Sequence, residues 1–144
     1  MDKQTLSAVL AQSPREEVIA LAGEAAGGRS IVLVKPAEKT LVMLKVRESV
    51  KQSLFYLGEI IATECLVEVD GNRGACVLMG DDQEKARAMA VIDAAHTAGF
   101  PQWPGVEARV NELGADVQRK RAEEAALHRK TQVRFSIMED RDGE

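Results

Sequence analysis

The stretch from Ile60 to Met79, IIATECLVEVDGNRGACVLM, decides the fold that this sequence predicts. Two mainly apolar runs, over 60–69 and 73–79, are typical of β-strands. Gly71-Asn72 lies between them, and such a pair between two apolar runs is a strong signal for a tight turn. The sequence therefore predicts an antiparallel hairpin.

The register of this hairpin divides its side chains between two faces of a sheet. With Gly71-Asn72 as a two-residue loop, Asp70 pairs with Arg73 and the two cysteines become diagonal neighbours, too far apart for a disulfide. If a further strand over 40–47 aligns regularly, the core face holds Ile61, Cys65, Val67, Val69, Cys76, Leu78, Val42, Leu44 and Val46. The second face holds Leu41, Met43, Ile60, Leu66, Val77 and Met79.

This second face carries more apolar residues than an ordinary surface requires. Two interpretations stay open. The N-terminal helices of the chain cover it, or it is the contact surface for a partner.

The residues before the hairpin predict two helices and further strands. Residues 2–12 form a short helix, and a second helix begins with Ser13 as N-cap and Pro14 in the first position. Gly27-Gly28 ends that helix. Strands follow over 30–34, which Pro36 stops, and over 40–47, and the stretch 49–59 is consistent with a bulged strand.

The residues after the hairpin predict two more helices. Asp81 with Glu84 resembles a capping box, and small apolar residues form one stripe along the helix that follows. A break over 99–105 precedes a long helix over 106–130, whose apolar seam fades after Val117. Because so polar a helix has little to bury against its own domain, we expect it to project or to lie across a neighbour. Residues 132–138 predict a short strand.

Together these patterns predict an α+β fold. An antiparallel four- to five-stranded sheet has helices packed on one face, and a long C-terminal helix is followed by a short strand. Residues 1–105 form the core domain, and residues 106–144 form a C-terminal extension that we expect to contact partners.

Composition limits the classes of function. The 144 residues carry a net charge of -4 with a pI of about 5.3, so no basic excess indicates a nucleic-acid partner. No apolar run approaches the roughly 20 residues that span a bilayer, and no signal-peptide pattern begins the chain, so we expect a cytoplasmic protein without a membrane contact. Cys65 and Cys76 are interpreted as reduced, buried thiols.

The sequence predicts no catalytic residue, no metal site and no cofactor. His96 and His128 lie in predicted helices, away from a nucleophile, and are interpreted as ordinary helix residues. Asp93 is interpreted as a buried, hydrogen-bonded aspartate in preference to a general base. The basic cluster of 119–121 with 129–130 fits an anion site, but interspersed glutamates favour a solvated face.

The order of several short motifs resembles one family. Phe55-Tyr56-Leu57-Gly58-Glu59 is followed by the hairpin, by Met79-Gly80 with Asp82, and by the helix segment 86–94; the chain closes with VRFSIM over 133–138. From Leu6 to Met138 the sequence resembles the PhnG family, a component of the bacterial carbon–phosphorus lyase system. Leu6 stands where the family often has tryptophan, and Ser136 where a second phenylalanine is usual.

The resemblance implies an accessory component of a larger complex. Family members join subunits H, I and J of the same system, and act with L, in moving the ribose triphosphate of ATP onto methylphosphonate with release of adenine. The resemblance places the nucleosidase chemistry in the I component and assigns no catalytic residue here. The expected partner surface holds Leu41, Met43, Leu66, Val77, Met79, Phe135 and Met138. The alternatives are a self-associating binding module that forms a homodimer, and a small enzyme that uses Asp93 and His96.

Overall fold

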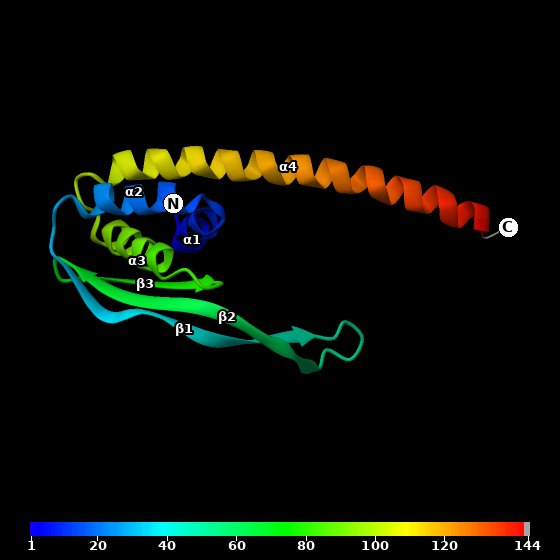
Figure 1. Cartoon of the computed structure of the whole chain (residues 1–144), viewed down its shortest axis with the longest axis horizontal. Helices are drawn as coiled ribbons and strands as arrows, with labels where there is room; N and C mark the ends of the chain where they lie inside the picture. The colour runs from blue at the N-terminus through cyan, green and yellow to red at the C-terminus, as the bar shows by residue number, and fades with distance from the viewer. Residues whose placement is uncertain (143–144) are drawn as a thin grey trace.

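The computed structural model describes the backbone of residues 1–142 and the side chains of residues 1–130. Figure 1 shows the helices on one side of a sheet, with α3 nearest the strands and α4 farthest from them. This arrangement confirms the predicted α+β class. In chain order the elements are α1 (Lys3–Gln12), α2 (Arg15–Ala26), β1 (Ile31–Arg47), β2 (Leu54–Val69), β3 (Asn72–Met79), α3 (Gln83–Ala98) and α4 (Trp103–Asp142).

In the described part of the chain, the sheet has three antiparallel strands in the order β1-β2-β3, so the prediction of four to five strands is wrong. The two strands predicted over 30–34 and 40–47 are one strand, β1, which passes through Pro36. Proline lacks an N–H group, and it is tolerated because β1 lies at the edge of the sheet. Register shifts on both sides of Lys35 absorb the irregularity. Of the stretch 49–59, residues 54–59 form the bulged beginning of β2, as predicted, and residues 49–53 belong to the turn between β1 and β2.

The turn between β2 and β3 lies one residue earlier than predicted. Val69 pairs with Asn72, so the loop is Asp70-Gly71, with φ angles of 52° and 83°. Positive φ at both positions defines the hairpin turn that favours Asp-Gly. Cys65 consequently pairs directly with Cys76, and the predicted diagonal arrangement is wrong. Each pairing partner changes by two positions, so the two faces of β2 and β3 remain as predicted.

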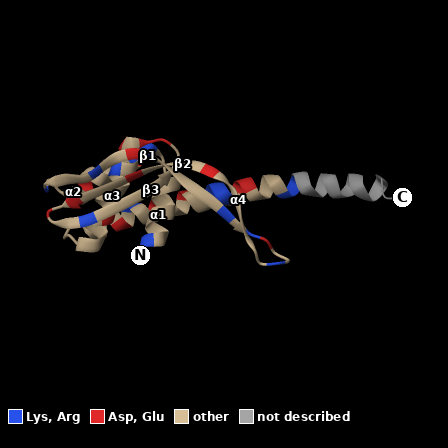
Figure 2. Ribbon diagram, turned by 90° about the horizontal axis from the view of Figure 1, so that it is seen from below, with Lys and Arg blue, Asp and Glu red and all other residues tan. Residues whose placement is uncertain are grey.

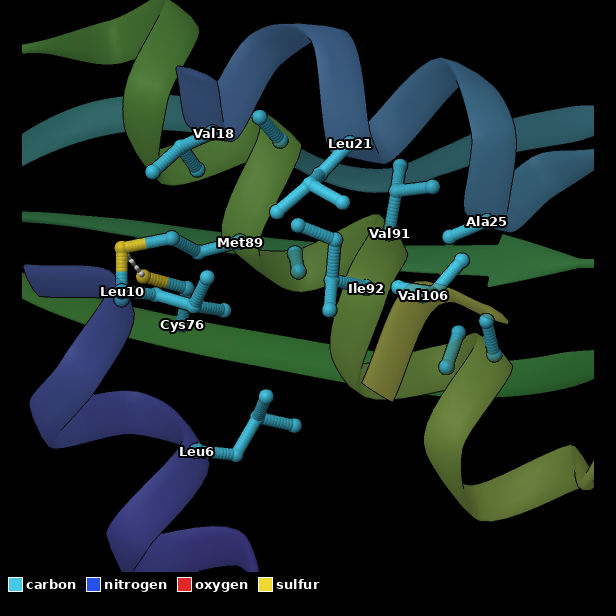
Figure 3. Close-up of a cluster of buried hydrophobic side chains, with 14 of the residues drawn as sticks. Leu6, Leu10, Val18, Leu21, Ala25, Cys76, Met89, Val91, Ile92 and Val106 are labelled. Atoms are coloured by element: carbon cyan, nitrogen blue, oxygen red, sulfur yellow. Dashed lines mark hydrogen bonds between the residues drawn. The ribbon is translucent and has the colours of Figure 1, made fainter. Parts of the chain in front are cut away.

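Helix α3 packs directly on the core face of the sheet. A Cβ atom on Gly74 of β3 would overlap the carbonyl oxygen of Ala90 and lie 2.5 Å from the backbone nitrogen of Ala94, so helix and strand are in backbone contact. Figure 3 shows Met89 of α3 above Cys76, with 3.9 Å between the two sulfur atoms. The core joins the sheet and α3 to α1, α2 and α4; it includes Leu6, Leu10, Val18, Leu21, Cys65, Val67, Val69, Cys76, Leu78, Ala88, Val91, Ile92, Ala95 and Val106.

Two helix starts differ from the prediction. Ser13 does not cap α2, because its hydroxyl donates to a carbonyl in the last turn of α1 at 2.6 Å, and Pro14 takes the N-cap position without a side-chain hydrogen bond. Helix α3 begins with Asp82 as N-cap, not Asp81. The Asp81 carboxylate instead lies 3.1 Å from Lys39 Nζ, so it ties the start of α3 to β1.

Helix α4 is longer than predicted. Its buried side chains pack over α1 and α2, and from Gln118 to Lys130 every side chain is exposed. The backbone stays helical through Asp142, so the strand predicted over 132–138 is wrong. A helix satisfies its backbone hydrogen bonds internally and continues where no strand lies alongside. The buried seam is Val106, Val110, Leu113 and Val117.

Candidate protein-interaction surface

Half of the β1–β2 hairpin extends beyond the rest of the fold, and we call residues 41–61 the hairpin arm. β3 ends at Met79, which pairs with Ala62, and the next residue, Gly80, donates its N–H to the Ile61 carbonyl at 2.8 Å. From that point to the turn, β2 pairs only with β1 within the described residues. Figure 1 shows the arm continuing past α3. A two-stranded ribbon by itself is marginally stable in water.

Among the side chains that the structure describes, the arm also holds the largest group of exposed hydrophobic residues. Nine of its large hydrophobic side chains are exposed, from 39% for Leu44 to 82% for Val50. Clustered exposed apolar residues mark interaction sites, and aromatic side chains are enriched in such interfaces. The nine residues are Leu41, Met43, Leu44, Val50, Leu54, Phe55, Tyr56, Leu57 and Ile61.

The pairing register places Leu41 and Met43 on the helix side of the ribbon. Leu41 pairs with Ile61, which lies on the same face of β2 as Cys65 because the strand is regular between them. The prediction that Leu41 and Met43 share a face with Val77 is therefore wrong. The register shifts near the start of β1 exchanged the two faces of its second half.

The same shifts correct the predicted core. Ile61 has the predicted face but is 50% exposed, because the helices do not cover that part of the ribbon. Val42 pairs with Ile60 and lies on the outer face with Leu44 and Val46. Leu44 is exposed and the two valines are half-buried, so none of these three residues belongs to the core.

The outer face of the sheet is uncovered. Val77 and Met79 are exposed, and Leu66 is half-buried. The described helices all lie on the opposite side, so the interpretation that the N-terminal helices cover this face is wrong. Ion pairs flank its apolar residues: Lys35 with Glu64, and Arg73 with Glu68 at 3.1 Å.

Asp93 and His96 both contact backbone groups. The Asp93 carboxylate accepts a hydrogen bond from the Ala75 N–H at 3.0 Å, and it thereby satisfies a backbone donor at the free edge of β3. The same carboxylate lies 3.8 Å from Lys3 Nζ. His96 Nε2 donates to the Met1 carbonyl at 2.8 Å, and its ring packs edge-on against Trp103 with centroids 4.9 Å apart. These contacts give both groups structural roles. Among the described residues, no three His, Cys, Asp or Glu side chains converge as for a metal ion.

The two cysteines are buried and unbridged. Burial raises the pKa of the Cys76 thiol to about 12, with smaller contributions from Cys65 and Asp93. A thiol with so high a pKa is unreactive at neutral pH, since the thiolate is the nucleophile.

A shallow groove of about 350 Å³ lies between α2 and α3. Its lining is mainly apolar, with Ile19, Ala22 and Val91 beside Arg87, and Glu84 at the rim is paired with Arg15. A single guanidinium over an apolar surface does not form a catalytic constellation.

The comparison with protein families identifies the chain. A family model described as "Phosphonate metabolism protein PhnG" matches residues 1–140. The chain belongs to the PhnG family. The resemblance drawn from the sequence is confirmed, and with it a role in phosphonate metabolism. No curated protein matches the chain. In the described part of this PhnG-family chain, no helix is long and apolar enough to cross a membrane.

Of the nine exposed residues of the arm, only Leu41 and Met43 were predicted as part of a partner surface. Phe55, Tyr56 and Leu57 contributed only to the family resemblance, although three large apolar residues beside a strand bulge are an interface signal in themselves. The side chains of Phe135 and Met138 lie outside the described residues, so their predicted partner contacts stay predictions.

Proposed function

We propose that this chain is an accessory, non-catalytic subunit of the carbon–phosphorus lyase core complex, and that it docks through the hairpin arm and the outer sheet face. The nine exposed hydrophobic side chains of the arm are the observation that carries this proposal. The PhnG match over residues 1–140 supplies the biological setting.

The physical argument concerns the free energy of an isolated ribbon. The arm has no third strand and no helical cover within the described residues, so its backbone order rests on one ladder of hydrogen bonds and little apolar burial. A partner that covers the arm removes apolar surface from water, and each Å² so buried contributes roughly 25 cal/mol of favourable free energy. The partner would cover the arm as α3 covers the other half of the hairpin. The exposed residues of the arm are therefore explained by assembly.

In the complex, the chain would support the transfer of ribose triphosphate from ATP to methylphosphonate, with release of adenine. Its partners would be subunits H, I and J, with L acting in the same step, in the cytoplasm. Another subunit would hold the reacting groups, and this chain would need no cofactor. The structural contacts of Asp93 and His96 favour this assignment over an independent enzyme.

The proposal gives both parts of the chain a role. Residues 1–105 would form the core domain that presents the outer-face residues Leu66, Val77 and Met79 together with the arm. Residues 106–144 would form an extension that contacts partners, with Phe135 and Met138 among the contacts.

Co-expression with subunits H, I and J, followed by size exclusion with mass detection, tests the proposal. The unaltered chain should co-elute with its partners. Leu41→Asp with Phe55→Asp in the arm should abolish co-elution, and Leu66→Asp with Val77→Asp tests the outer face separately. Ala8→Asp with Ala20→Asp is the matched control, since both alanines are exposed on helices outside the proposed contact regions and the added charge is equal. Failure of the unaltered chain to co-elute, or equal behaviour of arm and control variants, would contradict the proposal.

The second candidate is a self-associating module. Both long edges of the arm lack a neighbouring strand within the described residues, and such edges pair readily with a second copy. Size exclusion with mass detection on the chain without its partners tests this candidate. A dimer that the arm variant loses and the control variant keeps would support self-association.

A further inference from the structure

Positive charge is concentrated in the two projecting parts of this chain. The hairpin tip, residues 45–53, has three Lys or Arg and one Glu, and the exposed part of α4, residues 118–130, has five Lys or Arg and two Glu. The remainder of residues 1–117 has nine Lys or Arg against sixteen Asp or Glu. A chain with a net charge of -4 thus carries two basic projections on an acidic body.

These cations are largely unneutralised within the chain. Among the described side chains, Lys45, Arg47 and Lys51 have no ion pair, and Arg47 Nη1 donates instead to the backbone carbonyl of Gln52 at 2.9 Å. In the exposed part of α4, Arg119 pairs with Asp116, whereas Lys120 and Arg121 have no acidic partner among the described residues.

The body of the molecule differs from its projections. Its exposed cations are mostly paired with acids, such as Arg15 with Asp82 and Lys39 with Asp81. The positive charge that remains available to a partner is therefore concentrated at the hairpin tip and along α4.

The two projections extend in the same direction. Figure 1 shows α4 and the arm both continuing beyond α3 toward the same end of the molecule, and Figure 2 shows basic residues at the hairpin tip and along α4. Leu41, Met43, Lys45 and Arg47 lie at alternate positions of β1, on the helix side of the arm. This face of the arm is therefore apolar at its base and basic toward its tip.

We propose that the hairpin arm and the exposed part of α4 bind the same protein partner. The contact surface of that partner would have an apolar centre surrounded by acidic residues. This inference rests on the proposed function and adds the chemistry of the partner. A second copy fits poorly, because Glu64 and Glu68, the acids beside the apolar residues of its outer sheet face, are already paired with Lys35 and Arg73. A nucleic acid fits poorly as well, because the acidic body and the glutamates among the cations repel phosphates.

Association kinetics test this inference on the full chain and the partner protein that co-elutes with it. The first variant carries Lys45→Gln, Arg47→Gln and Lys51→Gln; the second carries Arg119→Gln, Lys120→Gln and Arg121→Gln. The control carries Lys3→Gln, Arg15→Gln and Arg87→Gln, which removes the same charge from exposed positions of the body outside the proposed docking surface. Circular dichroism confirms that each variant is folded.

Electrostatic attraction acts mainly on the association rate. Each projection variant should associate at least about tenfold more slowly at low salt, with a weaker salt dependence, and the control should match the unaltered chain. If the complex forms but the projection variants match the control, the inference is overturned and the proposed function stands. If the unaltered chain forms no complex, both are overturned. Binding of a single-stranded RNA oligonucleotide that the projection variants lose would also overturn the inference, since the partner would then be a nucleic acid.

Discussion

Both halves of the β1–β2 hairpin place apolar side chains on the helix side of the ribbon, but only one half is covered by a helix. In the half beneath α3, Val67 and Val69 are fully buried. In the arm, Leu41 and Ile61 lie on the same side of the ribbon and are 61% and 50% exposed. The pairing register thus fixes which side chains share a face, and whether that face is covered depends on where the helices end.

The largest expected effect concerns the covered half. Gly74→Ala should destabilise the fold by about 3 kcal/mol or more, because its Cβ would overlap the Ala90 carbonyl where helix and strand are in backbone contact. Gly58→Ala in the arm is the control, since a Cβ there meets no atom within 4 Å. Urea unfolding followed by circular dichroism measures both. Equal stability of the two variants would show that α3 does not pack on β3 as described.

A smaller effect compares the halves directly. Val67→Ala should cost about 2 kcal/mol, since it leaves a cavity beneath α3. Leu41→Ala, which removes more atoms from an exposed position, should change the free energy of unfolding of the isolated chain by under about 0.5 kcal/mol. The same urea titration measures both variants. A large loss from Leu41→Ala would mean that the arm is covered in the isolated chain.

The smallest expected effect is a dependence on alkaline pH in the covered half. Burial raises the pKa of Cys76 from 9.0 to about 12, so the folded state holds this proton more tightly than the unfolded state. This contribution to stability is complete below pH 9 and is lost as the pH rises toward 12. Between about pH 8 and pH 10, Cys76→Ala should therefore lose less stability than the unaltered chain. Lys85 acts in the opposite direction, because burial lowers its pKa, and it is common to both proteins. An identical loss in both proteins would contradict the assigned burial of the thiol.

Much of the covered half could be predicted from the sequence. The two apolar runs over 60–79 and the turn pair between them indicated the hairpin and the buried set from Cys65 to Leu78, and Gly27 ends α2 in the left-handed conformation as expected. Those features depend on local chemistry. The turn was displaced because Gly-Asn and Asp-Gly are both turn pairs, and only the pairing shows which one bends.

The arm could not be predicted in the same way. Proline breaks a strand in the interior of a sheet and is tolerated at an edge. The position of β1 at the edge depends on the tertiary fold and cannot be read from the residues around Pro36. The register shifts beside it then reversed the faces of Leu41 and Val42. The candidate surface was consequently found only in part: the exposure of Val77 and Met79 follows from the pattern, and that of Phe55 and Tyr56 follows from the length of the ribbon.

Hydrogen exchange of the backbone amides, read by mass spectrometry with and without the partner proteins, tests the central claim most directly. Amides of residues 62–69 should be protected in both states, because β2 lies between two strands there. Amides of the arm, residues 41–61, should exchange quickly in the isolated chain and become protected in the complex. Formation of the complex with no change in the exchange of the arm would contradict the account.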